Sequence, residues 1–157
     1  MSYSLMNKDE VVGKVLGLFL SKKGYSARVP KQRIKVDENG ILGDKFYAKE
    51  PNRSLLVTSF SSYQMAMNKG IMVGYGKLGE NIIIDYNPYH LPVGTEIKIG
   101  DTILQITQLC TICKSLTKID SQLPKLLKRD RGVFVKVVKS GAITIDDKVS
   151  INYINLH

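Results

Sequence analysis

Two cysteines, Cys110 and Cys113, stand three positions apart in the stretch QITQLCTICKSLTKID and are the only cysteines of the chain. Such a Cys-x-x-Cys pair is typical of a redox-active dithiol, of half a zinc site or of a single metal-binding thiolate, and it also fits two small core residues. Zinc needs four ligands, and the only histidines are His90, in a proline-flanked turn, and His157, at the end of the sequence. The shortage of suitable histidine ligands argues against structural zinc. A redox pair, a single metal ligand and a packing role stay open for the two cysteines.

The charge balance indicates a protein that attracts anions. The chain has 157 residues, a formal net charge of +9 and a pI near 9.5. Such a charge suits nucleic acid, acidic lipid or a small phosphorylated cofactor, and it also fits a solvated basic surface. The cations are spread without a long Lys/Arg block, and aromatic residues make up only 8% of the chain. Nucleic-acid binding is therefore a minority hypothesis.

The length and hydropathy predict one globular domain away from membranes. With 43% hydrophobic and 24% charged residues, the composition is that of a folded chain. No apolar run approaches the ~20 residues of a membrane-spanning helix. Met1–Glu10 is polar and lacks a signal-peptide core, so we expect a cytoplasmic protein with reduced thiols.

Short apolar alternating segments separated by Gly, Asn, Asp and Pro dominate the chain and predict β-strands. The predicted strands are Val11–Leu20, Arg33–Val36, Ser54–Thr58, Asn81–Asp85, Glu96–Ile99, Thr102–Thr107, Val133–Val138 and Ile143–Ile151. Gly100-Asp101 predicts a hairpin within Val93–Thr107. Helices are expected only at Ser59–Lys69 and Ser121–Arg129. We predict a mainly β protein, a closed or partly closed β-barrel with a few short helices, spanning residues 11–151 between an N-terminal segment (1–10) and a C-terminal tail (152–157).

Four stretches in this order resemble the MOSC domain, the C-terminal domain of molybdenum-cofactor sulfurases. They are GILGDKF (40–46), GKLGENIII (76–84), VGTEIKIGDTILQITQLCTIC (93–113) and DRGVFVKVVKSGAITIDDKVSI (130–151). The chain looks like a stand-alone member of that family. The resemblance implies a β-barrel that binds the molybdenum cofactor (molybdopterin), with Cys113 as catalytic residue and metal ligand.

The resemblance also implies where the chain departs from its family. Lys45 and Phe46 follow Asp44 where relatives commonly have His, and Cys110 and Ile112 occupy places where relatives often have Arg and Pro. Lys45 and Lys114 are then candidates to replace the missing positive charge. Lys114 would also favour the thiolate of Cys113, so we predict a reactive Cys113 and a dispensable, space-filling Cys110.

Three further polar residues are candidates to hold the cofactor. Arg53 and Arg131 could form bidentate hydrogen bonds to its phosphate, although either one alone is more often a solvated surface residue. The amide of Asn81, at the entrance of a strand, could bind the pterin or a substrate, or equally cap backbone groups in a turn. Asp44 has the same two readings, with the turn role favoured.

The function implied by the resemblance is reduction of small-molecule N-oxygenated (N-hydroxylated) substrates by a molybdenum-dependent oxidoreductase. The chain has no flavin or iron–sulfur motif, so electrons would come from separate electron-donor proteins. A second reading is a non-catalytic sulfur or cofactor carrier that receives sulfur from a donor as a Cys113 persulfide. A third is a basic barrel that binds nucleic acid, which strong salt-dependent affinity would reveal.

Overall fold

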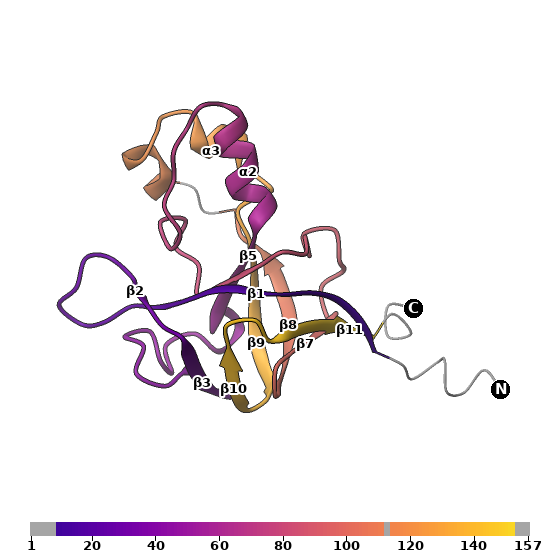
Figure 1. The fold of residues 1–157 in the computed structure, drawn as a ribbon. Coiled ribbons are helices and arrows are strands. Elements are labelled where there is room, and N and C mark those ends of the chain that lie inside the picture. The colour runs from indigo at the N-terminus through magenta and orange to yellow at the C-terminus, as the bar shows by residue number, and fades with distance from the viewer. Residues whose placement is uncertain (1–8, 112–113, 153–157) are drawn as a thin grey trace.

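The computed structural model describes residues 9–111 and 114–152, and strands dominate it (Figure 1). Its elements in chain order are β1 (Glu10–Leu20), β2 (Val29–Pro30), β3 (Arg33–Asp37), β4 (Gly40–Ile41), the 3-10 turn η1 (Pro51–Arg53), β5 (Leu55–Ser59), α2 (Phe60–Asn68), β6 (Ile82–Ile84), β7 (Glu96–Ile99), β8 (Thr102–Leu109), the 3-10 turn η2 (Lys114–Lys118), α3 (Leu123–Leu126), β9 (Val133–Lys139), β10 (Gly141–Thr144) and β11 (Lys148–Ile151).

Seven of the described strands close into a barrel. They follow one another in the order β11-β7-β8-β9-β5-β6-β1, and β1 pairs in turn with β11. The closing register runs from Glu10 opposite Ile151 to Lys14 opposite Lys148. Of these pairings β5–β6 is parallel and the others are antiparallel. The predicted β-barrel is therefore confirmed. Because β1 pairs with β11, these two strands are not left as open edges of the sheet.

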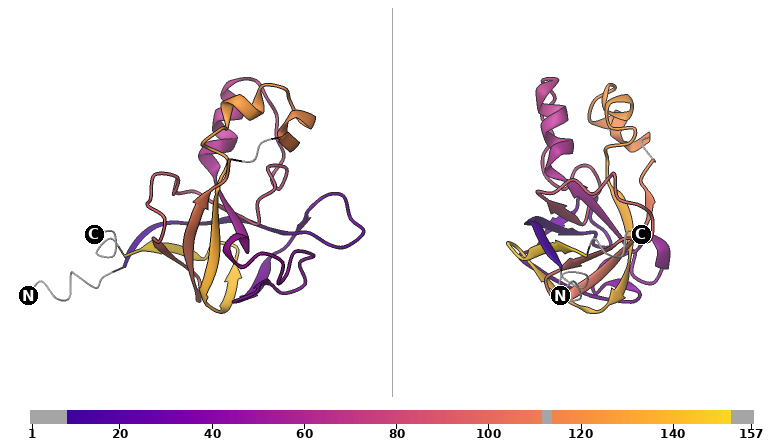
Figure 2. Two further views of the ribbon diagram at one scale, coloured as in Figure 1. Left: turned by 180° about the vertical axis from the view of Figure 1, so that it is seen from behind. Right: turned by 90° about the vertical axis from the view of Figure 1, so that its right-hand side faces the viewer.

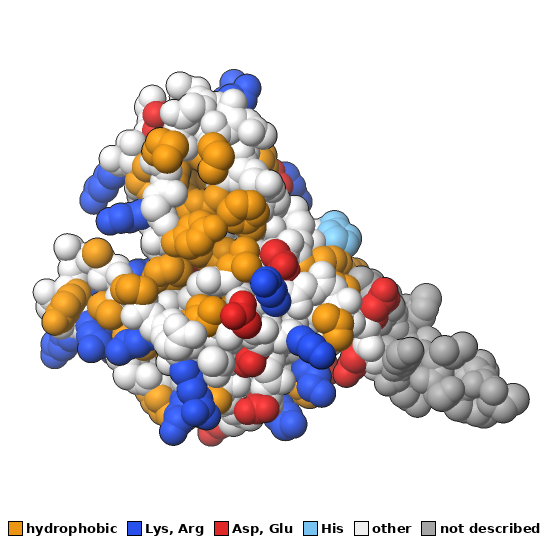
Figure 3. All heavy atoms as spheres, viewed as in Figure 1, with side chains coloured by type: hydrophobic (Ala, Val, Ile, Leu, Met, Phe, Trp, Pro, Cys, Tyr) orange, Lys and Arg blue, Asp and Glu red, His pale blue; other side chains and the backbone are white. Residues whose placement is uncertain are grey.

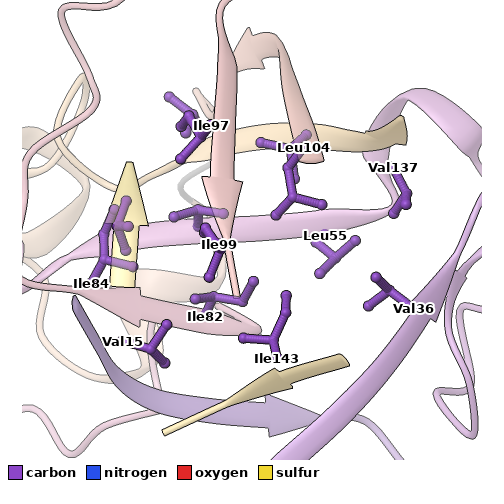
Figure 4. Packing of buried hydrophobic residues seen from close by; sticks show 14 of the residues in the cluster. Val15, Val36, Leu55, Ile82, Ile84, Ile97, Ile99, Leu104, Val137 and Ile143 are labelled. Carbon is purple, nitrogen blue, oxygen red and sulfur yellow. The ribbon is translucent and has the colours of Figure 1, made fainter. Parts of the chain in front are cut away.

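Alternation along the β7–β8 hairpin supplies part of the barrel core, whereas β5 and β6 are buried along their whole length. In the β7–β8 hairpin, Ile97 and Ile99 on one strand and Leu104 on the other are fully buried, while Lys98 faces solvent. Figure 4 shows their side chains pointing into the barrel with those of Ile82, Ile84 and other aliphatic residues. Each fully buried aliphatic side chain of this size contributes about 1.5–3 kcal/mol. The predicted hairpin turn at Gly100-Asp101 is present, with Gly100 at φ 56°.

The helices gather at one end of the barrel (Figure 2). α2 begins after Ser59, whose hydroxyl accepts a hydrogen bond from the Ser61 amide at 3.1 Å, as an N-cap should. α3 is only four residues long, shorter than predicted, although Leu127 beyond it is still fully buried. The two helices share a second core with Leu78 and Leu116. No helix in the described ranges is long and apolar enough to span a membrane.

One strand prediction was wrong. Ile143–Ile151 is not a single strand, because a turn divides it into β10 and β11. In that turn Asp146 adopts φ 73°, and the Asp147 carboxylate accepts a hydrogen bond from the Thr144 amide at 2.8 Å. β10 consequently leaves the barrel to pair with β3 in a separate three-stranded sheet, whereas β11 closes the barrel. The positive φ of Asp146 and the side-chain hydrogen bond of Asp147 stabilise this turn and interrupt the apolar alternation of the stretch.

Candidate functional site

A cavity of about 270 Å³ lies where the 42–50 segment and η1 meet the start of β5 and the turn before β6. Cationic, acidic and aromatic side chains all contribute to its wall. The lining residues are Arg28, Asp44, Phe46, Lys49, Glu50, Arg53, Ser54, Leu56, Gly79, Asn81 and Phe134. Three cations against two carboxylates, with two phenyl rings, suit a ligand that carries both an anionic group and an apolar or planar part.

Asp44 builds one wall of this cavity from the backbone. Its Oδ1 accepts the Ser21 amide at 2.6 Å and its Oδ2 accepts the Phe46 amide at 3.0 Å. The Lys45 amide also donates to the Ser21 carbonyl at 2.8 Å. These bonds tie the 42–50 segment to the end of β1. The turn role expected for Asp44 is therefore what the structure shows, and its charge is largely directed at backbone amides.

Arg28 is the cation whose hydrogen bonding is incomplete. Its Nη1 is buried and has no hydrogen-bond partner within the described ranges. Burial lowers the pKa of the Arg28 guanidinium, the Asp44 and Glu80 carboxylates oppose this effect, and Arg131 adds to it. An unsatisfied buried donor destabilises a protein by about 1–3 kcal/mol. An anion entering the cavity would remove that penalty.

Glu80 and Tyr63 form a buried pair behind the turn that lines the cavity. The Glu80 side chain is fully buried, and its Oε2 accepts hydrogen bonds from the Tyr63 hydroxyl and from the Gly76 amide. Glu80 Oε1 has no partner among the described residues. Burial raises the pKa of the Glu80 carboxyl, while the Tyr63 hydrogen bond and other contacts oppose the rise. Burial and the adjacent Glu80 raise the pKa of Tyr63.

Asn81 lines the cavity, but its side-chain amide forms hydrogen bonds with backbone groups. Its Oδ1 accepts the Leu56 amide at 3.0 Å, and its Nδ2 donates to the Phe19 carbonyl at 3.2 Å. Its own amide and carbonyl bond to the same two residues. Asn81 thus joins the start of β6 to both β5 and β1, instead of capping its own backbone in a turn.

Arg131 does not line the cavity, and its guanidinium serves as a clamp. Nε donates to the Leu78 carbonyl at 2.9 Å and Nη2 to the Ser115 hydroxyl at 3.3 Å. The side chain is only 7% exposed, and a Cβ on Gly79 would lie 3.0 Å from Nη2. Arg131 therefore joins the chain just after the Cys-x-x-Cys stretch to the turn that lines the cavity.

Two other predicted site residues, Arg53 and Lys45, differ in their relation to the cavity. Arg53 lines the cavity, with its guanidinium 5.0 Å from the centre of the Phe134 ring and 3.7 Å from the Glu50 carboxylate. Lys45 is exposed, does not line the cavity, and lies with Nζ 5.1 Å from the centre of the Phe46 ring.

The structure describes only some of the predicted residues near the two cysteines. Cys113, the predicted ligand, lies outside the described residues, and Lys114 begins η2. Cys110 is buried, with 2% of its surface exposed, as expected for a space-filling residue. Its amide donates to the Gly132 carbonyl at 2.8 Å, which attaches the stretch to the start of β9.

Sequence reasoning missed Arg28 and Lys49 as cavity residues and Phe46 and Phe134 as its aromatic wall. Arg28 and Lys49 lie in irregular segments, where no periodicity marks the direction of a side chain. Phe134 was recognised only as part of a strand. The orphaned nitrogen of Arg28 could not be found without coordinates, because its burial depends on segments that are distant in the sequence.

The described residues form a small, closed, mainly β barrel with helices at one end and a cavity lined by three cations. The chain belongs to the MOSC domain family, whose model matches residues 44–150. The family resemblance seen in the sequence is thereby confirmed.

Solved structures share this fold. The YuaD protein from Bacillus subtilis superposes with a TM-score of 0.78 at 17% identity, covering 92% of this chain and 98% of that one. YiiM from Escherichia coli gives 0.65 at 18% identity, covering 88% and 69%. YiiM from Geobacillus stearothermophilus gives 0.64 at 15% identity, covering 96% and 85%. At these identities the likeness is one of fold. A search of curated proteins found no match.

Proposed function

We propose that this protein binds the molybdenum cofactor in the cavity lined by Arg28 and Arg53, with Cys113 as the metal ligand, and reduces N-oxygenated small molecules. Membership of the MOSC family supports the cofactor assignment, since MOSC domains are associated with molybdenum cofactor binding in general. The observation that carries the proposal is the buried Nη1 of Arg28, which has no hydrogen-bond partner among the described residues and lies at the wall of a cationic cavity.

The cations of the cavity suit a phosphate group. A guanidinium presents a fork of donors that matches phosphate oxygens, and Arg28 has one donor available there. Lys49 adds a second positive charge. Arg53 is held over the Phe134 ring, so its planar group is oriented before a ligand arrives. The cavity residues therefore fit the phosphorylated part of the cofactor.

Arg131 links the chain just after Cys113 to the turn that lines this cavity. Ser115 lies two residues after Cys113 in the chain, and Arg131 joins Ser115 to the Leu78 carbonyl next to Gly79, a cavity residue. A thiolate is a soft ligand that suits a metal carrying sulfur ligands. In this scheme Lys114 supports the thiolate form, and Cys110 only packs.

When bound, the cofactor supplies the two-electron, oxygen-accepting chemistry for which the protein has no side chain. The overall reaction breaks the N–O bond of an N-hydroxylated substrate, consumes two electrons and two protons, and yields the amine and water. The phenyl rings of Phe46 and Phe134 would pack against the apolar part of the bound molecule. Electrons would come from a separate donor protein, in a cytoplasmic setting that keeps Cys113 reduced.

The test is molybdenum analysis of protein purified from cells that make the cofactor. We expect one metal per chain in the wild type, loss in Cys113→Ser, and near-complete retention in Cys110→Ala. Arg28→Gln should lower molybdenum content and also weaken binding of inorganic pyrophosphate, measured by thermal shift. Arg129→Gln, at an exposed position away from the cavity, is the matched control.

Two results would overturn the proposal. One is molybdenum content that is equal in the wild type and Cys113→Ser. The other is a Cys113 persulfide in metal-free wild-type protein from the same cells, detected by mass spectrometry, which would assign the protein to the sulfur-carrier function instead.

A further inference from the structure

A second hollow, of about 340 Å³, has a strongly basic lining. Four of its described lining residues are cations, and none is Asp or Glu. They are Lys22, Lys31, Arg33 and Lys35, and with the lining residues Leu20, Ile34, Leu42 and Gly43 they define the basic groove. Figure 3 shows Lys and Arg side chains gathered over the side of the molecule where β2 and β3 lie.

The strand pattern explains why these cations face solvent together. On β3, Ile34 and Val36 point into the core, so Arg33 and Lys35 point outward. The ion pairs within the described ranges, Lys14–Asp146 and Arg53–Glu50, involve none of the groove cations. Like charges held close together repel one another, and a negative partner relieves that repulsion.

One chain segment contributes to both the basic groove and the cavity lined by Arg28 and Arg53. Leu42 and Gly43 line the groove, whereas Asp44 and Phe46 line the cavity. Asp44 and Lys45 of this segment form hydrogen bonds with Ser21, the residue before Lys22. These bonds fix the segment against the chain that follows β1. The basic groove and the cavity are therefore lined by consecutive residues of one chain segment.

We propose that the basic groove docks an acidic, reduced electron-donor protein, an inference that rests on the proposed reductase function. The four cations match a negatively charged partner surface. Of the apolar lining residues Leu20 and Ile34 are buried and Leu42 is 48% exposed, so Leu42 offers an apolar contact beside the cations. Nucleic acid is less well matched, because no aromatic side chain among the described residues lines the groove for base stacking. The reduced donor gives up two electrons per turnover, two protons come from solvent, and the substrate oxygen leaves as water.

The test uses the cofactor-loaded full chain and two charge-reversal triples. Lys31→Glu/Arg33→Glu/Lys35→Glu alters the groove. Lys69→Glu/Lys125→Glu/Lys128→Glu alters exposed cations on and near the helices at the other end, with the same change in net charge. The probe is a small acidic FMN protein of the flavodoxin type. Its Kd is measured by calorimetry at 50 and 300 mM salt, and turnover is driven by this protein or by dithionite-reduced methyl viologen.

We expect the groove triple to weaken binding at least tenfold and the helix triple less than threefold, with wild-type affinity falling steeply as salt rises. Turnover driven by the FMN protein should fall in the groove triple, whereas dye-driven turnover should not change. Equal Kd values for the two triples would overturn the docking inference. Tighter wild-type binding to a 20-nucleotide single-stranded RNA, lost in the groove triple, would assign the groove to nucleic acid instead. Groove-dependent FMN-protein binding without dye-driven turnover would uphold docking and refute the reductase function.

Discussion

Replacing Arg131 by methionine tests whether this buried residue positions the segment that carries Cys113. The change keeps an unbranched apolar stem but removes the donors to the Leu78 carbonyl and the Ser115 hydroxyl. Leu78 is fully buried, so its carbonyl would lose a charged donor that solvent cannot replace without rearrangement. A hydrogen bond to a charged group contributes about 1.5–3 kcal/mol, and we expect a total loss of about 2–4 kcal/mol.

The assay is thermal unfolding of Arg131→Met beside Arg129→Met, a neighbouring exposed arginine. For a chain of this size 1 kcal/mol corresponds to roughly 2–4 °C, so the melting temperature should fall by roughly 5–15 °C. The exposed control should stay within about 0.5 kcal/mol of the wild type.

Destabilisation alone would not establish a positioning role. We therefore also expect the rate of Cys113 modification by a thiol reagent to change in Arg131→Met, measured well below its melting temperature, and to be partly restored in Arg131→Lys. A melting temperature equal to that of Arg129→Met would refute the hydrogen-bond reasoning. A normal Cys113 rate in a destabilised Arg131→Met would show that Arg131 supports the fold without positioning the cysteine.

Three further predictions concern single groups. Because burial raises the pKa of Glu80 in the folded chain, its contribution to stability is complete below about pH 4.3 and declines as pH rises through the folded pKa. The free energy of unfolding by urea should therefore fall less with rising pH in Glu80→Gln than in the wild type, and parallel curves would contradict this. At neutral pH Cys113 should react with a thiol reagent at least tenfold faster than Cys110, which is 2% exposed; comparable rates in Cys113→Ser and Cys110→Ala would argue for a redox pair. Ser59→Ala should destabilise the protein by about 1 kcal/mol through loss of the α2 N-cap, measured by urea unfolding, with the exposed Ser121→Ala as an unaffected control.

The predicted site and the observed cavity overlap only in part. Arg53 and Asn81 were selected from the sequence and do line the cavity, whereas Lys45 and Arg131 lie beside it. Asn81 and Arg131 were chosen as ligands because their side chains are polar and close to family motifs. The structure gives both of them backbone partners, since buried carbonyls and amides of neighbouring strands had to be satisfied.

The sequence by itself determined most of the strands, the hairpin at Gly100-Asp101, the capped helix α2 and the family, because alternation, turn chemistry and caps act between residues close together in the chain. Only the tertiary structure decided which distant segments meet. Closure of the barrel pairs Glu10 with Ile151, and the cavity brings Arg28 together with Asp44 and Gly79. The same holds for the basic groove, whose cations come from both sides of the β1–β2 loop and from β3. These juxtapositions follow from burying one continuous core, a requirement on the whole chain that no local pattern records.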